Sequence, residues 1–81
     1  MTNEEARLLL EKLNPTFTEL HREFSVIEAF AGGGWTTENG QRVDNDIMVV
    51  FNERGVSNEI RNAITARLTA AHPGLVVRFH P

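Results

Sequence analysis

The dipeptide Asn39-Gly40, which lies between two apolar segments, constrains the fold of this chain more than any other feature. Asn-Gly is the preferred pair for a two-residue type I′ turn, because both positions require positive φ, and such turns join antiparallel strands. The flanking segments, residues 24–31 (FSVIEAFA) and 46–51 (DIMVVF), are rich in the β-branched and aromatic residues typical of strands. The sequence therefore predicts a long β-hairpin over residues 24–51.

A turn centred on Asn39-Gly40 also predicts the register of the two strands. It sets three pairs opposite each other: Phe30 with Val49, Ala29 with Val50, and Gly32 with Ile47. Successive strand residues point to opposite faces. One predicted face carries Phe24, Val26, Phe30, Ile47, Val49 and Phe51, and the other carries Ile27, Ala29, Ala31, Met48 and Val50. Apolar residues on both faces indicate either a buried pair of strands or a second surface reserved for a partner.

The segment before the hairpin has the pattern of an amphipathic helix. Thr2 and Glu5 form a capping box, and apolar residues recur at helical spacing from Ala6 to Leu13. Pro15 interrupts this pattern, because proline has no amide hydrogen and disfavours a helical residue before it. Helix after Pro15 is expected either as a kinked continuation or as a second short helix, and we expect this region to cover one face of the sheet.

The segment after the hairpin predicts a second helix and a third strand. Ser57 is a plausible N-cap, and His72-Pro73-Gly74 ends the helix. The expected apolar stripe contains Ile60, Ala63, Ile64, Leu68 and Ala71, and the residues expected to face water are Arg61, Asn62, Thr65 and Thr69. Residues 75–79 (LVVRF) then form a strand, which would run parallel to 46–51 if both lie in one sheet.

These elements predict one small α+β domain over residues 1–81. The expected order is α-β-β-α-β, with a three-stranded sheet, a long central hairpin and helices packed on one face. Apolar residues make up 41% of the chain, which favours a packed core over disorder. Cysteine is absent, so neither disulfides nor thiolate metal sites support the fold.

Charge and hydropathy exclude several classes of partner. The net charge is −3 and the arginines are scattered along the chain, so the concentrated basic face of a nucleic-acid-binding protein is not expected. No apolar run approaches the roughly 20 residues that span a bilayer. The acidic N-terminal segment lacks the basic start and apolar run of a signal peptide. We expect a soluble, cytoplasmic protein without a membrane partner.

One motif within the hairpin carries possible chemistry. Gly32-Gly33 is followed, after 10 intervening residues, by Asp44-Asn45-Asp46 and then by an apolar strand. This arrangement resembles the minimal nucleotidyltransferases, including those paired with toxins as antitoxins. The resemblance implies that Asp44 and Asp46 hold Mg²⁺ against nucleotide phosphates, and that backbone amides at Gly32 and Gly33 approach those phosphates.

The sequence departs from that family at the third carboxylate, which is expected on the last strand. Residues 75–79 contain no carboxylate and carry the positive charge of Arg78 instead. The residue between the two aspartates is Asn45, where the family has an apolar one. These departures favour a degenerate, non-catalytic relative. In the simplest alternative, Asp44 and Asp46 are ordinary polar residues at a strand boundary.

The leading interpretation is therefore a small non-catalytic protein-interaction module, such as an inhibitor, an antitoxin-like protein or an assembly subunit. It would bind another protein or a second copy of itself through sheet-edge or hairpin contacts. Phe30 and Trp35 are the expected contact residues, because aromatic anchors often dominate interfaces; the alternative is that both lie in the core. No cofactor is expected, and Mg²⁺ is required only if the chain is a nucleotidyltransferase-like enzyme.

Overall fold

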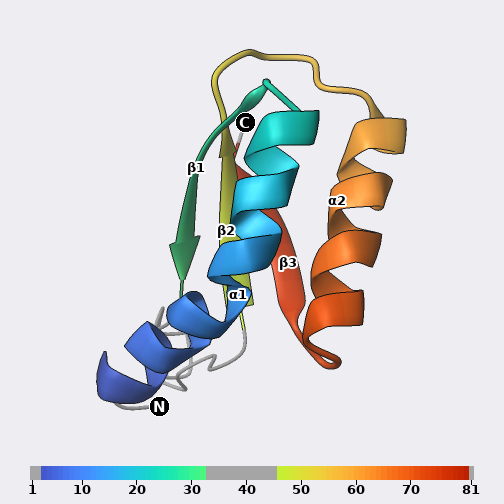
Figure 1. Ribbon diagram of the computed structural model, residues 1–81. Helices are drawn as coiled ribbons and strands as arrows, with labels where there is room; N and C mark the ends of the chain where they lie inside the picture. The colour runs from blue at the N-terminus through green and yellow to red at the C-terminus, as the bar shows by residue number, and fades with distance from the viewer. Residues whose placement is uncertain (1–2, 33–45, 81) are drawn as a thin grey trace, which may run out of the picture.

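The computed structural model describes residues 3–32 and 46–80, and it contains two helices and three strands within these ranges (Figure 1). The elements follow the predicted α-β-β-α-β order. Their bounds are α1 (Asn3–Glu23), β1 (Ile27–Gly32), β2 (Asp46–Phe51), α2 (Asn58–Ala71) and β3 (Val76–His80). The prediction of a small α+β domain is confirmed.

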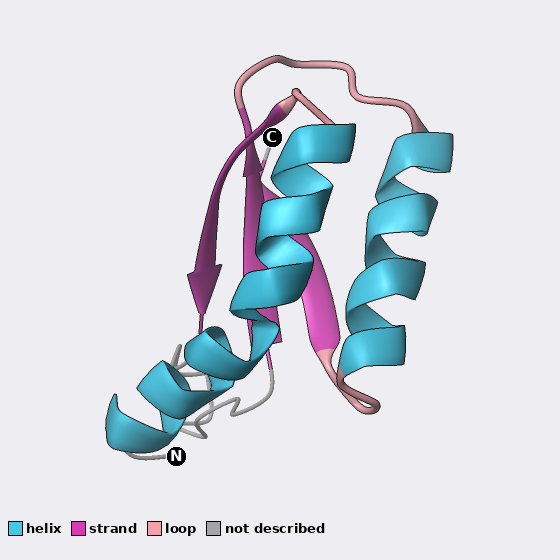
Figure 2. Ribbon diagram, in the orientation of Figure 1, coloured by secondary structure: helices cyan, strands magenta, loops and turns pink. Residues whose placement is uncertain are grey.

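The three strands form one mixed sheet in the order β1-β2-β3. β2 is antiparallel to β1 and parallel to β3, and both helices lie on the same face of the sheet (Figure 2). The predicted hairpin register is confirmed, because Phe30 lies opposite Val49 and Gly32 lies opposite Ile47. The turn at Asn39-Gly40 that suggested this register falls outside the described residues.

One part of the predicted hairpin is wrong. The register shifts between Ile27 and Ala29, so that Ile27 pairs with Phe51. Glu28 is the extra residue of a β-bulge, which reverses the alternation of side chains between the two faces. Ile27 is consequently buried on the helix side of the sheet instead of lying on the opposite face.

The core lies between the sheet and the two helices. Along β2, alternate side chains point toward the helices and are buried, whereas the residues between them are half-buried. The buried apolar residues are Leu9, Leu13, Phe17 and Leu20 from α1; Ile27, Ile47, Val49 and Phe51 from the sheet; and Val56, Ile64, Leu68 and Leu75. Because every strand and both helices contribute or pack against this cluster, the domain has one core.

Helix α1 continues through Pro15 instead of ending there. Proline has no amide hydrogen, so the carbonyl of Glu11 loses its intrahelical donor. The hydroxyl of Thr18 donates to the carbonyl of Asn14 at 3.1 Å, one turn further along. Figure 1 shows that the N-terminal turns of α1 run at an angle to its C-terminal turns. Of the two expected alternatives, the kinked continuation is the one observed.

Helix α2 begins at the predicted cap. The side chain of Ser57 accepts a hydrogen bond from the amide of Ile60 at 3.3 Å. At the other end, the amide of His72 donates to the carbonyl of Leu68 at 3.0 Å. Gly74 then takes φ +87°, a value that glycine adopts without steric cost. The chain thereby reverses into β3.

Three residues of α2 differ from the prediction that they face water. Thr65 and Thr69 are half-buried, and their hydroxyls donate to backbone carbonyls one turn back. Arg61 is also half-buried, because its side chain extends from α2 toward the sheet and lies over the ring of Phe51. Ala71, expected in the buried stripe, is exposed at the end of the helix.

Ion pairs join the two helices along their outer sides. Arg67 of α2 lies 3.3 Å from the carboxylate of Glu19 and also donates to Glu23, both on α1. The hydrogen bond and the charge of Glu23 raise the pKa of the Arg67 guanidinium above its ordinary value. These contacts lie at the surface, where ion pairs contribute little to stability.

Candidate functional site

The structure brings together one glycine and one aspartate of the predicted nucleotide site. Gly32 ends β1 and lies opposite Ile47, the residue that follows Asp46 in β2. The two candidate residues therefore lie at the same end of adjacent strands. Gly33, Asp44 and the predicted contact residue Trp35 fall outside the described residues.

Asp46 is enclosed by the fold, with only 2% of its surface exposed. Its strand partner in β3 is Val76. Within residues 3–32 and 46–80, no group of three or more His, Cys, Asp or Glu side chains could hold a metal ion. Magnesium coordination by Asp44 and Asp46 stays a prediction from the sequence, as does phosphate binding at Gly32 and Gly33.

Gly32 has a packing role that the sequence did not reveal. A Cβ atom at this position would lie 2.6 Å from Cδ2 of Leu10 and 3.2 Å from Cδ1 of Ile47. Carbon atoms do not approach that closely without a shift of the neighbouring groups. The absence of a side chain at Gly32 therefore lets α1 pack over the end of the hairpin.

This packing yields a stability prediction. Substitution Gly32→Ala is expected to lower the free energy of unfolding by about 1–2 kcal/mol, the usual cost of forcing extra volume into a packed site. Urea denaturation followed by circular dichroism measures the change. In a Leu10→Ala background the same substitution should cost less, because the nearest crowding atoms, those of Leu10, are gone. An equal cost in both backgrounds would contradict the assigned contact.

Phe30, the other predicted contact residue, packs against α1. Its ring stacks on Phe17 with centroids 4.1 Å apart, and His21 meets it edge-on at 5.0 Å. The ring is half-buried in this arrangement. The structure thus gives Phe30 an internal packing role, and its assignment as an interface residue stays a prediction.

The face of the sheet opposite the helices is not covered by any of the described helices and strands (Figure 2). We call it the open face. By strand alternation and register, its described side chains are Ala29, Ala31, Asp46, Met48, Val50, Val76, Arg78 and His80. Val76 is 44% exposed, Asp46 is buried, and the other residues are exposed or half-buried. The open face is therefore mainly apolar, with a buried aspartate at the start of β2 and two basic residues along β3.

The two edges of the sheet are less suited to pairing with another strand. The bulge at Glu28 interrupts the regular spacing of hydrogen-bonding groups along β1. At the other edge, exposed Arg78 lies in the middle of β3. A symmetric antiparallel pair centred there would set one Arg78 against the other. Bulges and edge charges are common features that prevent edge-to-edge association.

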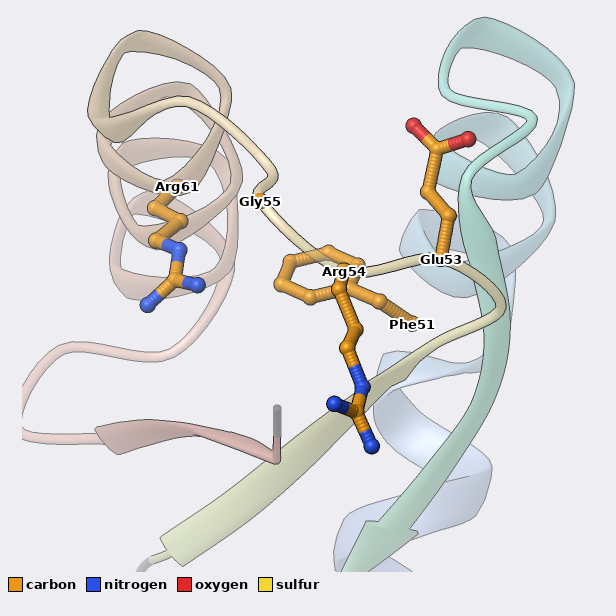
Figure 3. Close-up of a pocket in the computed structure, with 5 residues that line it drawn as sticks. All are labelled: Phe51, Glu53, Arg54, Gly55 and Arg61. Atoms are coloured by element: carbon orange, nitrogen blue, oxygen red, sulfur yellow. The ribbon is translucent and has the colours of Figure 1, made fainter.

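A pocket of about 370 Å³ lies at the carboxyl end of β2, where the chain leaves the sheet for α2 (Figure 3). Its lining residues are Phe51, Glu53, Arg54, Gly55 and Arg61. In open sheets of parallel strands, ligands bind at the carboxyl ends of the strands. Sequence reasoning missed this pocket, although Arg54 and Gly55 lie within four residues of the end of a predicted strand in a strand-helix-strand unit.

Arg61 is held in this pocket by two aromatic rings. Its Cζ atom lies 5.7 Å from the ring centroids of both Phe51 and Phe79. These two rings stack on each other with centroids 5.5 Å apart. The guanidinium is therefore attracted to both ring faces. Its Nε atom is buried and has no hydrogen-bond partner among the residues that the structure describes.

Comparison with known proteins supplies no relative. No protein-family model, curated protein or solved structure matches this chain. Neither α1 nor α2, as far as the structure describes them, combines the length and apolar character of a bilayer-spanning helix.

Proposed function

We propose that this protein is a non-catalytic interaction domain that binds a second copy of itself through the open face of its sheet. The observation that carries the proposal is the apolar character of that face. Met48 and Val50 of the central strand lie between Ala29 and Ala31 on one side and the residues of β3 on the other. Sheets with such faces pack against each other about 10 Å apart.

The distribution of charge favours a second copy as the occupant. The open face is basic along β3, where Arg78 and His80 are exposed, whereas β1 carries exposed Glu28 at the opposite edge. A two-fold axis parallel to the strands sets β3 of each copy over β1 of the other. The basic edge of each copy then faces the acidic edge of the other, so the dimer contains this contact twice. Such complementarity fixes the relative orientation of two surfaces.

The size of the open face indicates the strength of association. Three strands about 4.8 Å apart and five or six residues long present a face of roughly 14 by 20 Å. That area is smaller than the contact of a typical stable complex, which buries about 800 Å² on each partner. We therefore expect a weak, reversible dimer, as for other contacts that bury less than about 1,200 Å² in total.

Sedimentation velocity over a concentration series tests the proposal with two matched variants. Val76 on the open face and Leu8 on α1 are both exposed large apolar residues, at 44% and 50%. Substitution Val76→Lys introduces a charge into the proposed contact and should weaken dimerisation at least tenfold, a loss of about 1.4 kcal/mol. Substitution Leu8→Lys adds the same charge outside the open face and should leave the dissociation constant unchanged.

Two results would contradict the proposal. The first is a wild-type protein that sediments as a monomer up to concentrations on the order of a millimolar, where even a weak specific dimer is populated. The second is an equal increase of the dissociation constant in Val76→Lys and Leu8→Lys, which would show that the contact does not lie on the open face. Circular dichroism of both variants verifies that they remain folded.

A further inference from the structure

Arg54 and Arg61 have no anionic partner among the described residues, unlike Arg7 and Arg67 and like Arg22. Arg7 is paired with Glu11, and Arg67 is paired with carboxylates of α1. No hydrogen-bond acceptor or carboxylate contacts the side chain of Arg54 or Arg61 within the described part of the chain. Both side chains line the pocket at the end of β2. The pocket therefore contains two positive charges that are available to a ligand.

The orientation of the lining side chains separates these charges from the carboxylate of Glu53. In Figure 3 the guanidinium groups of Arg54 and Arg61 both extend downward in the view, toward the sheet. The carboxylate of Glu53 points in the opposite direction. The side of the pocket between the two guanidinium groups is consequently positive.

The side chain of Arg61 packs against the protein. Its guanidinium lies over the rings of Phe51 and Phe79, and its Nε is buried. Its terminal nitrogens remain as donors. A side chain that is held in place loses little conformational entropy when it binds, so more of the interaction free energy contributes to affinity.

We propose that this pocket binds the phosphate group of a small phosphate ester. Arg54 and Arg61 donate hydrogen bonds to the phosphate oxygens, and the ring of Phe51 contacts the organic part of the ligand. Two guanidinium groups match the charge of about −1.5 to −2 on a phosphate monoester, and the planar guanidinium suits bidentate contacts with phosphate. The volume of about 370 Å³ lies in the range of small-molecule sites.

This site is independent of the proposed dimer contact. Its residues come from the end of β2, the following loop and α2, which lies on the helix side of the sheet. None of the five lining residues belongs to the open face. Failure of dimerisation would therefore leave the phosphate proposal intact, and the reverse also holds.

Nuclear magnetic resonance titration tests the phosphate proposal, with the amide of Gly55 as reporter. The probes are phenyl phosphate, inorganic phosphate and the uncharged analogue benzyl alcohol. We expect a saturable shift of the Gly55 amide with phenyl phosphate, weaker binding of inorganic phosphate and no binding of benzyl alcohol. Arg54→Gln should weaken phenyl phosphate binding roughly tenfold to a hundredfold, the usual effect of losing hydrogen bonds to a charged group.

Two further variants make the test specific. Arg61→Lys retains the charge but removes the planar guanidinium, and it should also weaken binding at least tenfold, as expected when a bidentate contact is lost. Arg7→Gln removes a positive charge near the start of α1, far from the pocket along the chain, and should have no effect. Arg54 is exposed, and its side chain contacts no acceptor within residues 3–32 and 46–80, so Arg54→Gln should fold like the wild type.

Three outcomes would overturn the proposal. One is the absence of a saturable shift at Gly55 with either phosphate probe. Another is a loss of affinity in Arg7→Gln equal to that in Arg54→Gln, which would show general charge attraction instead of a site. The third is inorganic phosphate binding as tightly as phenyl phosphate, because the organic part would then contribute nothing.

Discussion

Substitution Leu20→Ala is expected to lower the free energy of unfolding by about 2–5 kcal/mol, the range measured for buried leucines. Leu20 lies on α1 with none of its surface exposed, in the cluster that joins the helix to the sheet. A domain of 81 residues has a total stability of only about 4–12 kcal/mol. The substitution should therefore remove a large fraction of the stability. Urea denaturation followed by circular dichroism measures it.

Leu8 provides the control for this substitution. It lies on the same helix but is 50% exposed, so Leu8→Ala changes the same side chain without opening a cavity. Its effect should stay within about 0.5 kcal/mol, as for surface positions in general. Similar losses at Leu8 and Leu20 would mean that the helix presents a different face to the sheet.

Substitution Phe51→Ala is expected to cost about 3–5 kcal/mol, the usual loss for a buried phenylalanine. Phe51 ends the central strand and is 6% exposed. Its removal opens a cavity, eliminates the stacking on Phe79 and takes away one of the two rings that hold Arg61. Thermal and urea denaturation should both show the loss.

A double-mutant cycle separates the contact with Arg61 from the cavity. Single variants Phe51→Ala and Arg61→Ala and the double variant should give a coupling energy of about 0.5–2 kcal/mol, as for cation–π pairs that are partly desolvated. A second cycle, which combines Phe51→Ala with Arg67→Ala, serves as the reference. Arg67 contacts α1 and not Phe51, so these two losses should be additive. Additive losses for Phe51 and Arg61 would contradict the observed geometry.

Local signals in the sequence predicted most of the fold. The Asn39-Gly40 pair and two β-rich segments were sufficient for the register of β1 and β2 up to the bulge. Ser57 correctly marked the start of α2, because an N-cap acts within one turn. The parallel pairing of β3 followed from the helical connection between two strands of one sheet.

The errors arose where tertiary packing decides the outcome. The bulge at Glu28 reversed the face of Ile27, and no residue pattern announces a bulge at that position. Arg61 was expected to face water because it is charged, but its long side chain covers two rings. Pro15 was compatible with either of two expected structures, and packing of both halves of α1 on one core selects the continuous helix.

The candidate sites were less predictable than the fold. Gly32 and Asp46 do lie on adjacent strands, as the motif required. The pocket at the end of β2 was not predicted, because it combines residues from a strand, a loop and a helix that are dispersed in the sequence. Its shape depends on the separation of α2 from β2, which residue patterns do not specify.

The alternation of side chains along β2 has an evolutionary consequence. Ile47, Val49 and Phe51 maintain the interior of the domain, whereas Met48 and Val50 point away from it. Substitutions at the second set can therefore change the surface of the open face while the first set keeps the fold intact. Under the proposed association through the open face, a single short strand would let binding preference diverge between descendants without a loss of thermal tolerance.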